Sequence, residues 1–415
     1  MHRLMKIQLT APQTLQATIN LPASKSISNR ALVLRAFSQG VQPIENLADC
    51  DDTMVIIKAF TDNSEVVDIK AAGTAMRFLT AFYATQSGTH ILTGTERMKQ
   101  RPIRILVDAL RQLGAQIEYV EQDGFPPLRI TGTKLHSATL TLPGDVSSQY
   151  ISALLMIAPT LPQGLTLQLK GKVTSLPYID MTLQLMREFG AKAQRDDVLE
   201  GMTIQAESDP YQDILYTIEN DWSAASYWYE MVALSQDSQA KVTLPHLKQI
   251  SSQGDSKVAG LFKLLGVQTD YTDNGISICK QGEKCQQMNY DFVEIPDLTQ
   301  TFTVTCCLLD IPFRFTGLHT LRIKETDRIS ALINELHKLG YKLYAEGDDV
   351  LRWEGERCEP EGHPVIATYD DHRMAMAFAP AALRLPNITI EHPEVVSKSY
   401  PHFWEDIQQV GFRID

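Results

Sequence analysis

The chain changes from strand to helix at Pro22-Ala23-Ser24-Lys25-Ser26-Ile27-Ser28-Asn29-Arg30. The alternating apolar residues before this stretch predict a strand, and the apolar run after it, Ala31-Leu32-Val33-Leu34, predicts a helix. The serines are typical helix caps, so Lys25 and Arg30 are expected in the first turns. Cations there oppose the helix dipole, whereas a bound phosphate or carboxylate would explain them. A capped surface helix with two solvated cations explains this stretch alone equally well.

The composition is that of an ordinary globular protein. The chain has 415 residues, of which 44% are hydrophobic and 21% charged, and this length suffices for two or three domains. Its net charge of −12 argues against a nucleic acid or an anionic membrane as the partner, because both attract a basic surface. A small anionic ligand stays possible, and clusters of Lys and Arg are then the signal to follow.

The chain shows no signal peptide, no apolar run long enough for a membrane span and no metal-ligand spacing. Its six cysteines lack paired CxxC spacing, and the adjacent Cys306 and Cys307 lie in an apolar run typical of a core. We therefore expect a cytoplasmic protein with reduced cysteines, without a structural zinc, another metal or an organic cofactor. We also expect a monomer.

Two interleaved series of residues repeat along the chain. Capped helices rich in small apolar residues begin near Gly73, Ser147, Trp222, Asp297 and Asp371, which are 74, 75, 75 and 74 residues apart. A second series of helices is expected to end at Gly114, Gly190, Gly266, Gly340 and Gly411, with spacings of 76, 76, 74 and 71. Strand–helix proteins can look periodic by chance, but two series with one period indicate a repeated unit.

Each repeat holds two helices and several strands, in the order strand–helix–strand–helix–strand–strand. Strand-like runs lie between the helices at residues 90–92, 138–142, 165–169 and 388–390. A second helix of the first repeat is expected from Asp51 to about Phe60. Only about 13 residues separate this helix from Gly73, so the first repeat has lost most of its terminal strand pair. The simplest count is six repeats, three in each of two domains.

Lysines and arginines collect at the starts of helices. Arg77 follows the Gly73 cap. Other cations are expected to precede or open four further helices: Arg97, Lys99 and Arg101 before a helix beginning at Pro102; Lys324 and Arg328 before Ile329–Leu339; Arg373 before Met374–Leu383; and Lys398 before a helix beginning at Pro401. In a chain of negative net charge, this recurrence favours helix N-termini that bind a ligand with more than one anionic group.

Simpler interpretations stay open for several of these residues. The segment Lys324-Glu325-Thr326-Asp327-Arg328 has the spacing of a surface ion-pair lattice. Asp297 is more often a cap than a catalyst, and His372 is more often a cap or a packed residue than a proton donor. Ser147-Ser148-Gln149 could serve only as a cap.

Together these motifs resemble the 5-enolpyruvylshikimate 3-phosphate synthase (3-phosphoshikimate 1-carboxyvinyltransferase) family. The similarity runs nearly from end to end, and the order of the motifs is more specific than any one of them. It rests on Ser24–Arg30, Gly73–Arg77, Arg97–Pro102, Ser147–Gln149, Ser175–Asp180, Gln253–Asp255, Pro296-Asp297, Lys324–Arg328, Asp371–Met376 and Lys398.

The resemblance implies an α/β fold of two domains, each built of three βαβαββ units, with the first unit here truncated. The first domain would comprise residues 22–220, mainly on the shikimate 3-phosphate side. The second would comprise residues 1–21 and 221–415, with the active site in the cleft between the domains.

The implied reaction belongs to the shikimate pathway, which leads to chorismate and the aromatic amino acids. It transfers the enolpyruvyl group of phosphoenolpyruvate to the 5-hydroxyl of shikimate 3-phosphate and releases phosphate, through a tetrahedral intermediate. Asp297 would be the base on the hydroxyl, and Glu325 would protonate the methylene carbon and later take the proton back. Lys25 and Lys324 would complete the catalytic set. No metal or cofactor is implied.

The resemblance also assigns residues to the two substrates. Shikimate 3-phosphate would be held by Lys25, Ser26, Arg30, Ser147, Ser148, Gln149, Ser175, Tyr178, Asp297, Thr320 and Lys324. Phosphoenolpyruvate would be held by Lys25, Gly73, Arg101, Gln149, Arg328, His372, Arg373 and Lys398.

The sequence departs from the family pattern at three positions besides the shortened unit. Ala71 and Thr320 stand where the family usually has Asn, and Leu176 where it often has Lys. Two alternatives therefore stay open: a UDP-N-acetylglucosamine enolpyruvyl transferase, and a non-catalytic anion-binding relative.

Overall fold

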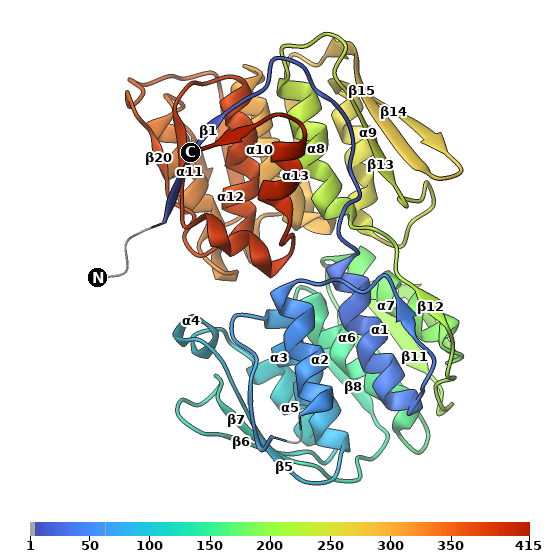
Figure 1. Ribbon diagram of the computed structural model, residues 1–415. Helices are drawn as coiled ribbons and strands as arrows, with labels where there is room; N and C mark the ends of the chain where they lie inside the picture. The colour runs from blue at the N-terminus through green and yellow to red at the C-terminus, as the bar shows by residue number, and fades with distance from the viewer. Residues whose placement is uncertain (1–4, 63) are drawn as a thin grey trace. The chain divides into compact units, whose positions relative to one another are not determined.

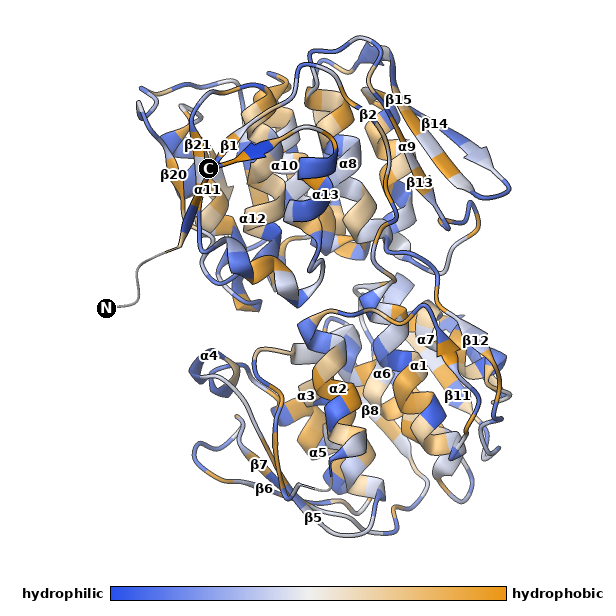
Figure 2. Cartoon of the chain, in the orientation of Figure 1, coloured by the Kyte–Doolittle hydropathy of each residue, from blue (hydrophilic) through white to orange (hydrophobic). Residues whose placement is uncertain are grey.

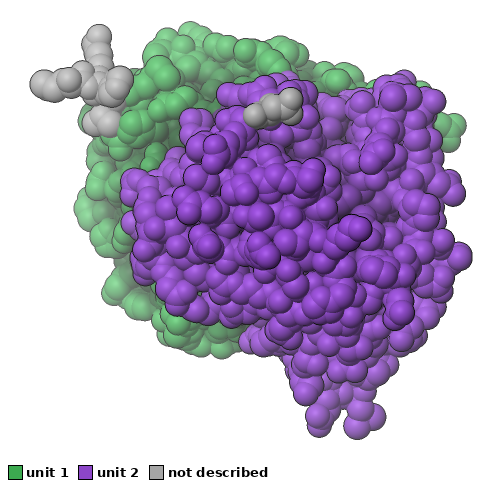
Figure 3. All heavy atoms as spheres, turned by 90° about the horizontal axis from the view of Figure 1, so that it is seen from below, with its two compact units in different colours: residues 1–22, 219–415 green, residues 23–218 purple. Residues whose placement is uncertain are grey.

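The computed structural model describes residues 5–62 and 64–415, and it folds as a mixed α/β protein (Figure 1). The chain divides into two compact units, which Figure 3 distinguishes by colour. Unit 1 comprises residues 1–22 and 219–415, and unit 2 comprises residues 23–218. These edges lie one and two residues from those expected at 22 and 220. Each unit has its own hydrophobic core.

One strand pattern recurs in five four-stranded sheets. The first two strands of each sheet are parallel, and the remaining two add in antiparallel fashion. In unit 2 these sheets are β4 (Val66–Asp68), β5 (Thr89–Thr93), β7 (Leu128–Thr131) and β6 (Gln116–Tyr119); and β8 (Thr139–Pro143), β9 (Leu165–Lys170), β11 (Gly201–Ala206) and β10 (Ala193–Val198). The predicted βαβαββ repeat is confirmed.

Unit 1 contains the other three of these sheets. In spatial order they are β2 (Gln16–Thr18), β13 (Lys241–Pro245), β15 (Gly275–Lys284) and β14 (Leu265–Thr272); β16 (Met288–Asp291), β17 (Phe313–Thr316), β19 (Val350–Trp353) and β18 (Tyr344–Glu346); and β20 (Val365–Ile366), β21 (Ile388–Glu391), β1 (Lys6–Thr10) and β22 (Arg413–Ile414). The N-terminal strand β1 thus completes the sheet formed by the end of the chain.

The first repeat has a shorter sheet. Its strand β12 (Tyr216–Thr217) pairs in parallel with β3 (Ile44–Glu45), and over the described residues this sheet has two strands. Within residues 5–62 and 64–415, this sheet lacks the antiparallel pair present in the other five, as the short interval before Gly73 predicted.

The first helix of each repeat lies in the core of its unit. These helices are α1 (Lys25–Ser38), α3 (Gly73–Thr85), α6 (Ser148–Ile157), α8 (Trp222–Leu234), α10 (Thr299–Leu308) and α12 (His372–Phe378). In α10 and α12 every residue is buried, and apolar colours dominate both helices in Figure 2. Helices α8, α10 and α12 pack against one another (Figure 1). A helix surrounded by other elements is apolar on all sides, which explains its small apolar residues.

The second helix of each repeat covers the outside of the core. These helices are α2 (Asp51–Thr61), α5 (Arg104–Gln112), α7 (Leu176–Glu188), α9 (Val258–Lys263), α11 (Arg328–Lys338) and α13 (Phe403–Gln409). Four of the five predicted glycine stops follow such a helix in the left-handed conformation, with φ between 91° and 97°: Gly114, Gly190, Gly340 and Gly411. Glycine adopts this conformation at little cost.

The fifth glycine stop is wrong. Helix α9 already ends at Lys263, and Gly266 lies within β14, where the pairing with β15 shifts between Leu265 and Val267. Its positive φ therefore serves a strand irregularity and not a helix end.

Both expected proline starts are also wrong. Helix α5 begins at Arg104 and not at Pro102, because the Pro102 carbonyl accepts the Tyr150 hydroxyl at 2.5 Å and the Ile103 N–H bonds to Gly124. Helix α13 begins at Phe403, two residues after Pro401. Of the cations expected before Pro102, two lie in a separate short helix, α4 (Glu96–Lys99).

Short 3-10 segments complete the chain. They are η1 (Ala158–Thr160), η2 (Gly254–Lys257), η3 (Phe292–Glu294), η4 (Pro296–Leu298), η5 (His319–Ile323), η6 (Ala379–Leu383) and η7 (Pro393–Lys398). Among the described residues, no helix has the length and apolar character to cross a membrane, and no group of side chains is arranged to hold a metal ion.

Candidate active site

The start of α1 places Lys25 at the first helical position. Its ammonium lies 3.1 Å from Oδ2 of Asp52, in the first turn of α2. Ser24 occupies the N-cap position, but its hydroxyl makes no capping hydrogen bond, so the predicted serine cap is wrong. The N-terminal amides of α1 are thus not capped by Ser24, which suits a helix start that binds an anion.

Arg30 connects three helices of unit 2. Its buried guanidinium donates to Thr182 of α7 at 2.7 Å and to Ser152 of α6 at 3.2 Å, and also to the Ser26 carbonyl at 2.9 Å. Burial lowers the pKa of Arg30 to about 10, so the side chain stays cationic at neutral pH. Arg30 therefore fixes α1, α6 and α7 relative to one another. Its predicted contact with shikimate 3-phosphate stays a prediction.

The start of α3 lies against a buried arginine. A Cβ atom on Gly73 would approach Nη1 of Arg101 to 2.6 Å, so glycine leaves the room that this guanidinium occupies. Gln149 of α6 donates to the Thr74 hydroxyl at 3.2 Å and joins the start of α6 to that of α3. The structure thus brings Gly73 and Arg101 together, with Gln149 bonded to the next residue of α3.

Serines mark the starts of α6 and α7. Ser147 accepts the N–H of Gln149 at 3.3 Å and so caps α6, as the simpler interpretation of this motif predicted. Ser148 follows as the first helical residue. Ser175 precedes α7 with φ of 53°, a left-handed conformation that is uncommon outside glycine and frequent at ligand sites. Tyr178, in the first turn of α7, has its ring 6.0 Å from the Arg30 guanidinium.

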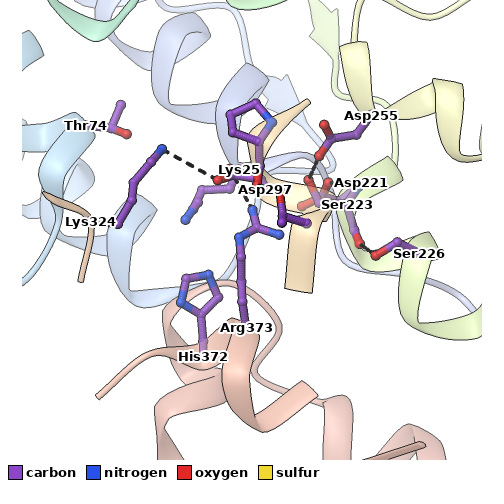
Figure 4. A network of polar contacts seen from close by, with 12 residues as sticks. Lys25, Thr74, Asp221, Ser223, Ser226, Asp255, Asp297, Lys324, His372 and Arg373 are labelled. Carbon is purple, nitrogen blue, oxygen red and sulfur yellow. Dashed lines mark hydrogen bonds and ion pairs between the residues drawn. The ribbon is translucent and has the colours of Figure 1, made fainter. Parts of the chain in front are cut away.

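In unit 1, Asp297 is the centre of a charged network (Figure 4). Its carboxylate accepts from Arg373 at 2.8 Å and from Arg328 at 3.2 Å, and the Lys324 ammonium lies 3.6 Å away. Asp297 lies inside η4, and the N-cap positions of η4 and α10 are occupied by Ile295 and Leu298. The interpretation of Asp297 as a helix cap is therefore wrong.

Arg328 holds three carboxylates at the first position of α11. It is 1% exposed and donates to Asp371 at 2.7 and 3.3 Å and to Glu325 at 3.1 Å, besides its contact with Asp297. Burial alone would lower the pKa of Arg328, but the charges of Asp371, Glu325 and Asp297 together raise it.

Glu325 has a cation on each oxygen. Lys398, at the end of η7, donates to the second oxygen at 2.7 Å. The pairing between Glu325 and Arg328 is buried, and Asp327 pairs instead with Arg322 at 2.8 Å. The surface-lattice interpretation of this segment is therefore wrong.

Asp371 was not among the predicted site residues, although it marked one of the repeats. It is fully buried, caps α12 by accepting the Arg373 N–H at 2.9 Å, and binds the Arg328 guanidinium. The His372 imidazole lies 3.6 Å from the same carboxylate. The position of Asp371, directly before His372 and Arg373, was the sequence feature that could have identified it as a site residue.

Asp255 is a second carboxyl group that the site prediction missed. It lies in η2, is 4% exposed, and accepts a short hydrogen bond from the Ser223 hydroxyl (Figure 4). Burial first, and then the Asp297 charge, raise the pKa of Asp255 to about 7. The motif Gln253-Gly254-Asp255 carried part of the family resemblance, but nothing in the sequence connects it to Asp297.

The network of unit 1 thus combines four cations with three carboxylates: Lys324, Arg328, Arg373 and Lys398 with Asp297, Glu325 and Asp371. Thr320 lies in η5, four residues before Lys324, and among the described residues no side-chain hydrogen bond joins it to the network. The excess of cations suits an anionic ligand, and the carboxylates beside them suit proton transfer.

The solved structures with a similar fold define the class of protein: two α/β units built from repeated βαβαββ elements. Two structures of EPSP synthase from Acinetobacter baumannii match 99% of this chain and 99% of their own length, with TM-scores of 0.77 and 0.74 at 19% identity.

The sequence comparisons identify the family within this class. The family described as EPSP synthase (3-phosphoshikimate 1-carboxyvinyltransferase) matches residues 9–62 and 56–407. A 3-phosphoshikimate 1-carboxyvinyltransferase of Bacteroides fragilis is 57% identical over 410 residues, 99% of each chain. One of Vibrio cholerae is 36% identical over 96% of this chain and 98% of its own. The chain belongs to the EPSP synthase family.

Proposed function

We propose that this chain transfers the enolpyruvyl group of phosphoenolpyruvate to the 5-hydroxyl of shikimate 3-phosphate. The observation that carries the proposal is the network of unit 1, in which two carboxylates, Asp297 and Glu325, share the cation Arg328. The reaction moves two protons, one from an oxygen and one to and from a carbon, so it needs two such groups. The family membership of the chain supports the same activity.

In the addition step, the C5 oxygen bonds to C2 of phosphoenolpyruvate while Asp297 takes the hydroxyl proton and Glu325 protonates the methylene carbon. In the elimination step, the C2–O bond to phosphate breaks and Glu325 takes a proton back from the methyl group. The proton on Asp297 leaves with the phosphate, so Asp297 is again the carboxylate, and Glu325 again the carboxylic acid, with which the addition step began. Lys324, Lys25 and the arginines stabilise the charge that develops at C2 and on the leaving phosphate.

We assign the substrates to the groups that the family resemblance indicates. Unit 2 would bind shikimate 3-phosphate through Lys25, Ser26, Arg30, Ser147, Ser148, Gln149, Ser175 and Tyr178, and unit 1 would add Asp297, Thr320 and Lys324. Phosphoenolpyruvate would be bound by Arg328, His372, Arg373 and Lys398 of unit 1 and by Lys25, Gly73, Arg101 and Gln149 of unit 2. Several of these residues lie in the first turns of helices, which supports the assignment because amide groups there favour anions: Lys25, Ser26, Gly73, Ser148, Arg328, His372 and Arg373.

A phosphate-release assay tests the proposal. We expect phosphate from phosphoenolpyruvate only when shikimate 3-phosphate is present. Release with UDP-N-acetylglucosamine and none with shikimate 3-phosphate would instead indicate the related UDP-sugar transferase. Tight binding of shikimate 3-phosphate without product would indicate a non-catalytic relative.

We also propose that the protein acts as a cytoplasmic monomer. The family and the ordinary charge pattern of the chain support this proposal. Light scattering after size-exclusion chromatography measures the oligomeric state, and fractionation of the producing cells measures the location.

A further inference from the structure

The loop between β20 and α12 carries two residues in an unfavourable backbone conformation. Tyr369 has φ of 55° and Asp370 has φ of 54°, so two consecutive residues with side chains are in the left-handed region. The next three residues are Asp371, His372 and Arg373, which belong to the charged network of unit 1. Strained backbone of this kind persists only where surrounding contacts hold it.

Glu335 of α11 supplies such contacts. Its carboxylate is fully buried and accepts the Tyr369 hydroxyl at 2.7 Å and the Ala367 N–H at 3.0 Å. The Lys338 ammonium donates to the same carboxylate at 2.7 Å and to the Val365 carbonyl at 2.9 Å. The three donors compensate the buried charge, which would otherwise be costly. Helix α11 therefore holds this segment at three residues: Val365 of β20, and Ala367 and Tyr369 of the loop.

Helices α11 and α12 are also joined directly, at their starts. Arg328, seven residues before Glu335 on α11, binds the Asp371 carboxylate, and Asp371 caps α12 by accepting the Arg373 N–H. Arg373 in turn donates to Asp297. Tyr369 and Asp370, the two residues with positive φ, lie where the segment passes from its contacts with Glu335 to the contact of Asp371 with Arg328. A change in their backbone would therefore turn the start of α12.

We propose that Glu335 and Tyr369 form a positioning pair that holds the start of α12, and with it Arg373, in the orientation that binds phosphoenolpyruvate. The inference rests on the proposed function, because phosphoenolpyruvate is the ligand that Arg373 is assigned to bind. Burial, and then the Glu335 carboxylate, raise the pKa of Tyr369 to about 12, so its hydroxyl keeps the donated proton at neutral pH.

The variant Tyr369→Phe removes only the hydroxyl. We expect the KM for phosphoenolpyruvate to rise about tenfold, the equivalent of one charge-assisted hydrogen bond, while the KM for shikimate 3-phosphate changes much less. A purely structural role would lower the melting temperature but leave this ratio of KM values unchanged. Assays are therefore run well below the melting temperature of each variant.

A matched control is available in the same unit. The hydroxyl of Tyr344, on β18, donates to the exposed carboxylate of Glu356, and neither residue belongs to the charged network. Tyr344→Phe should keep both KM values of the parent chain. A folded Tyr369→Phe variant with the parent KM for phosphoenolpyruvate would overturn the proposal.

A second variant and a second readout keep the test independent of turnover. Glu335→Gln retains an acceptor for Tyr369 but loses the charge that Lys338 and the Ala367 N–H bind, so phosphoenolpyruvate binding should weaken here too. Calorimetric titration with phosphoenolpyruvate, with shikimate 3-phosphate left out so that no turnover occurs, measures this for all variants. A parent chain that binds both substrates without forming product would contradict the proposed function alone, whereas unchanged binding in both variants would contradict only the positioning pair.

Discussion

Glu325 is a carboxylate held between two cations, Lys398 and Arg328, at 2.7 and 3.1 Å. In the proposed reaction it exchanges a proton with a carbon atom, which an amide of the same shape cannot do. We expect Glu325→Gln to lower kcat at least about 100-fold, with KM values within a few-fold of the parent. Steady-state phosphate release measures both quantities.

The chain offers a control for this variant. Glu346 also pairs with two arginines, Arg314 at 2.8 Å and Arg352 at 2.7 Å, on an exposed sheet. Glu346→Gln should therefore turn over like the parent chain. If Glu325→Gln did the same, Glu325 would have no place in the mechanism.

Asp255 gives the site a specific pH dependence. Because its pKa is raised to about 7, the carboxyl is neutral below this pH and becomes charged as the pH rises through it. The new negative charge appears beside Asp297 and opposes an anionic ligand. We expect the affinity for phosphoenolpyruvate to fall between about pH 6 and about pH 8 in the parent chain, and to fall less in Asp255→Asn. Calorimetric titrations at the two pH values measure this difference, and identical pH dependence in both chains would contradict the assignment.

Gly73 leaves space for the Arg101 guanidinium. A methyl group at Gly73 would meet Nη1 of Arg101 at 2.6 Å, and the flexible end of the arginine can move away without disturbing the fold. Gly73→Ala should therefore raise the KM for phosphoenolpyruvate and leave the melting temperature near that of the parent. Gly260→Ala, in α9, is the control, because a Cβ there meets nothing within 4 Å. Equal KM values in the two variants would mean that Arg101 does not bind this substrate.

At the level of helices, α8 carries a glutamate in the middle of the core. Glu230 is 0% exposed, and burial raises its pKa well above the ordinary value of a glutamate, although the Thr305 hydroxyl of α10 acts in the opposite direction. In the unfolded chain Glu230 ionises near its ordinary pKa, whereas in the folded chain it stays neutral. Its contribution to stability is therefore complete below the ordinary pKa and is lost as the pH rises towards the folded pKa.

Replacing Glu230 with glutamine should remove this loss of stability at higher pH. We expect Glu230→Gln to be more stable than the parent at about pH 8, with a free energy of unfolding that depends less on pH, by up to about 1.4 kcal/mol per pH unit. Urea unfolding at about pH 5 and about pH 8 measures the difference. The exposed Glu283, on β15, provides the control Glu283→Gln, and a parent-like pH slope in Glu230→Gln would show that Glu230 is charged in the folded chain.

The repeated elements could be predicted from the sequence because local chemistry determines their ends. Three of the core helices, α6, α8 and α12, begin after a capping side chain, and most outer helices end at a glycine with a positive φ. Pro102 and Gly266 misled the prediction, because distant partners decide their conformations: Tyr150 bonds to the Pro102 carbonyl, and the shifted pairing of β14 with β15 sets Gly266.

The candidate site could be predicted only in part, because contacts between residues distant in sequence also determine which carboxylates belong to it. Cations at helix starts stood out against a negative net charge, and the structure joins Lys324, Arg328, Arg373 and Lys398 in one network. The carboxylates Asp371 and Asp255 did not stand out, because the first is also an ordinary helix cap and the second meets Asp297 only in the folded chain. The predicted roles of the unit 2 residues, and the cleft between the domains, stay predictions.

The whole molecule consists of two units with separate cores, one of them inserted into the other in sequence. Unit 2 is a single continuous segment with its own helices, sheets and hydrophobic core, so we expect residues 23–218 to fold alone. Circular dichroism and a cooperative urea transition of this fragment would demonstrate it. A fragment without cooperative unfolding would show that the core of unit 2 depends on the rest of the chain.

One hydrogen bond indicates how to join the two segments of unit 1 into a single fragment. The Asp221 N–H donates to the Pro22 carbonyl at 2.9 Å, so the two chain ends left by removing unit 2 are adjacent. A short flexible linker between residues 22 and 219 should therefore give a folded unit 1, measured in the same way.

The N-terminal strand imposes an order on how this protein matures at the ribosome. Strand β1 is translated well before both of its neighbours in the sheet, β21 and β22, because the whole of unit 2 lies between them in sequence. Unit 2, which is complete about halfway through translation, can fold while the chain still grows. The last sheet of unit 1 cannot close completely before β22 has been translated, and until then β1 exposes unpaired edges that a chaperone could cover.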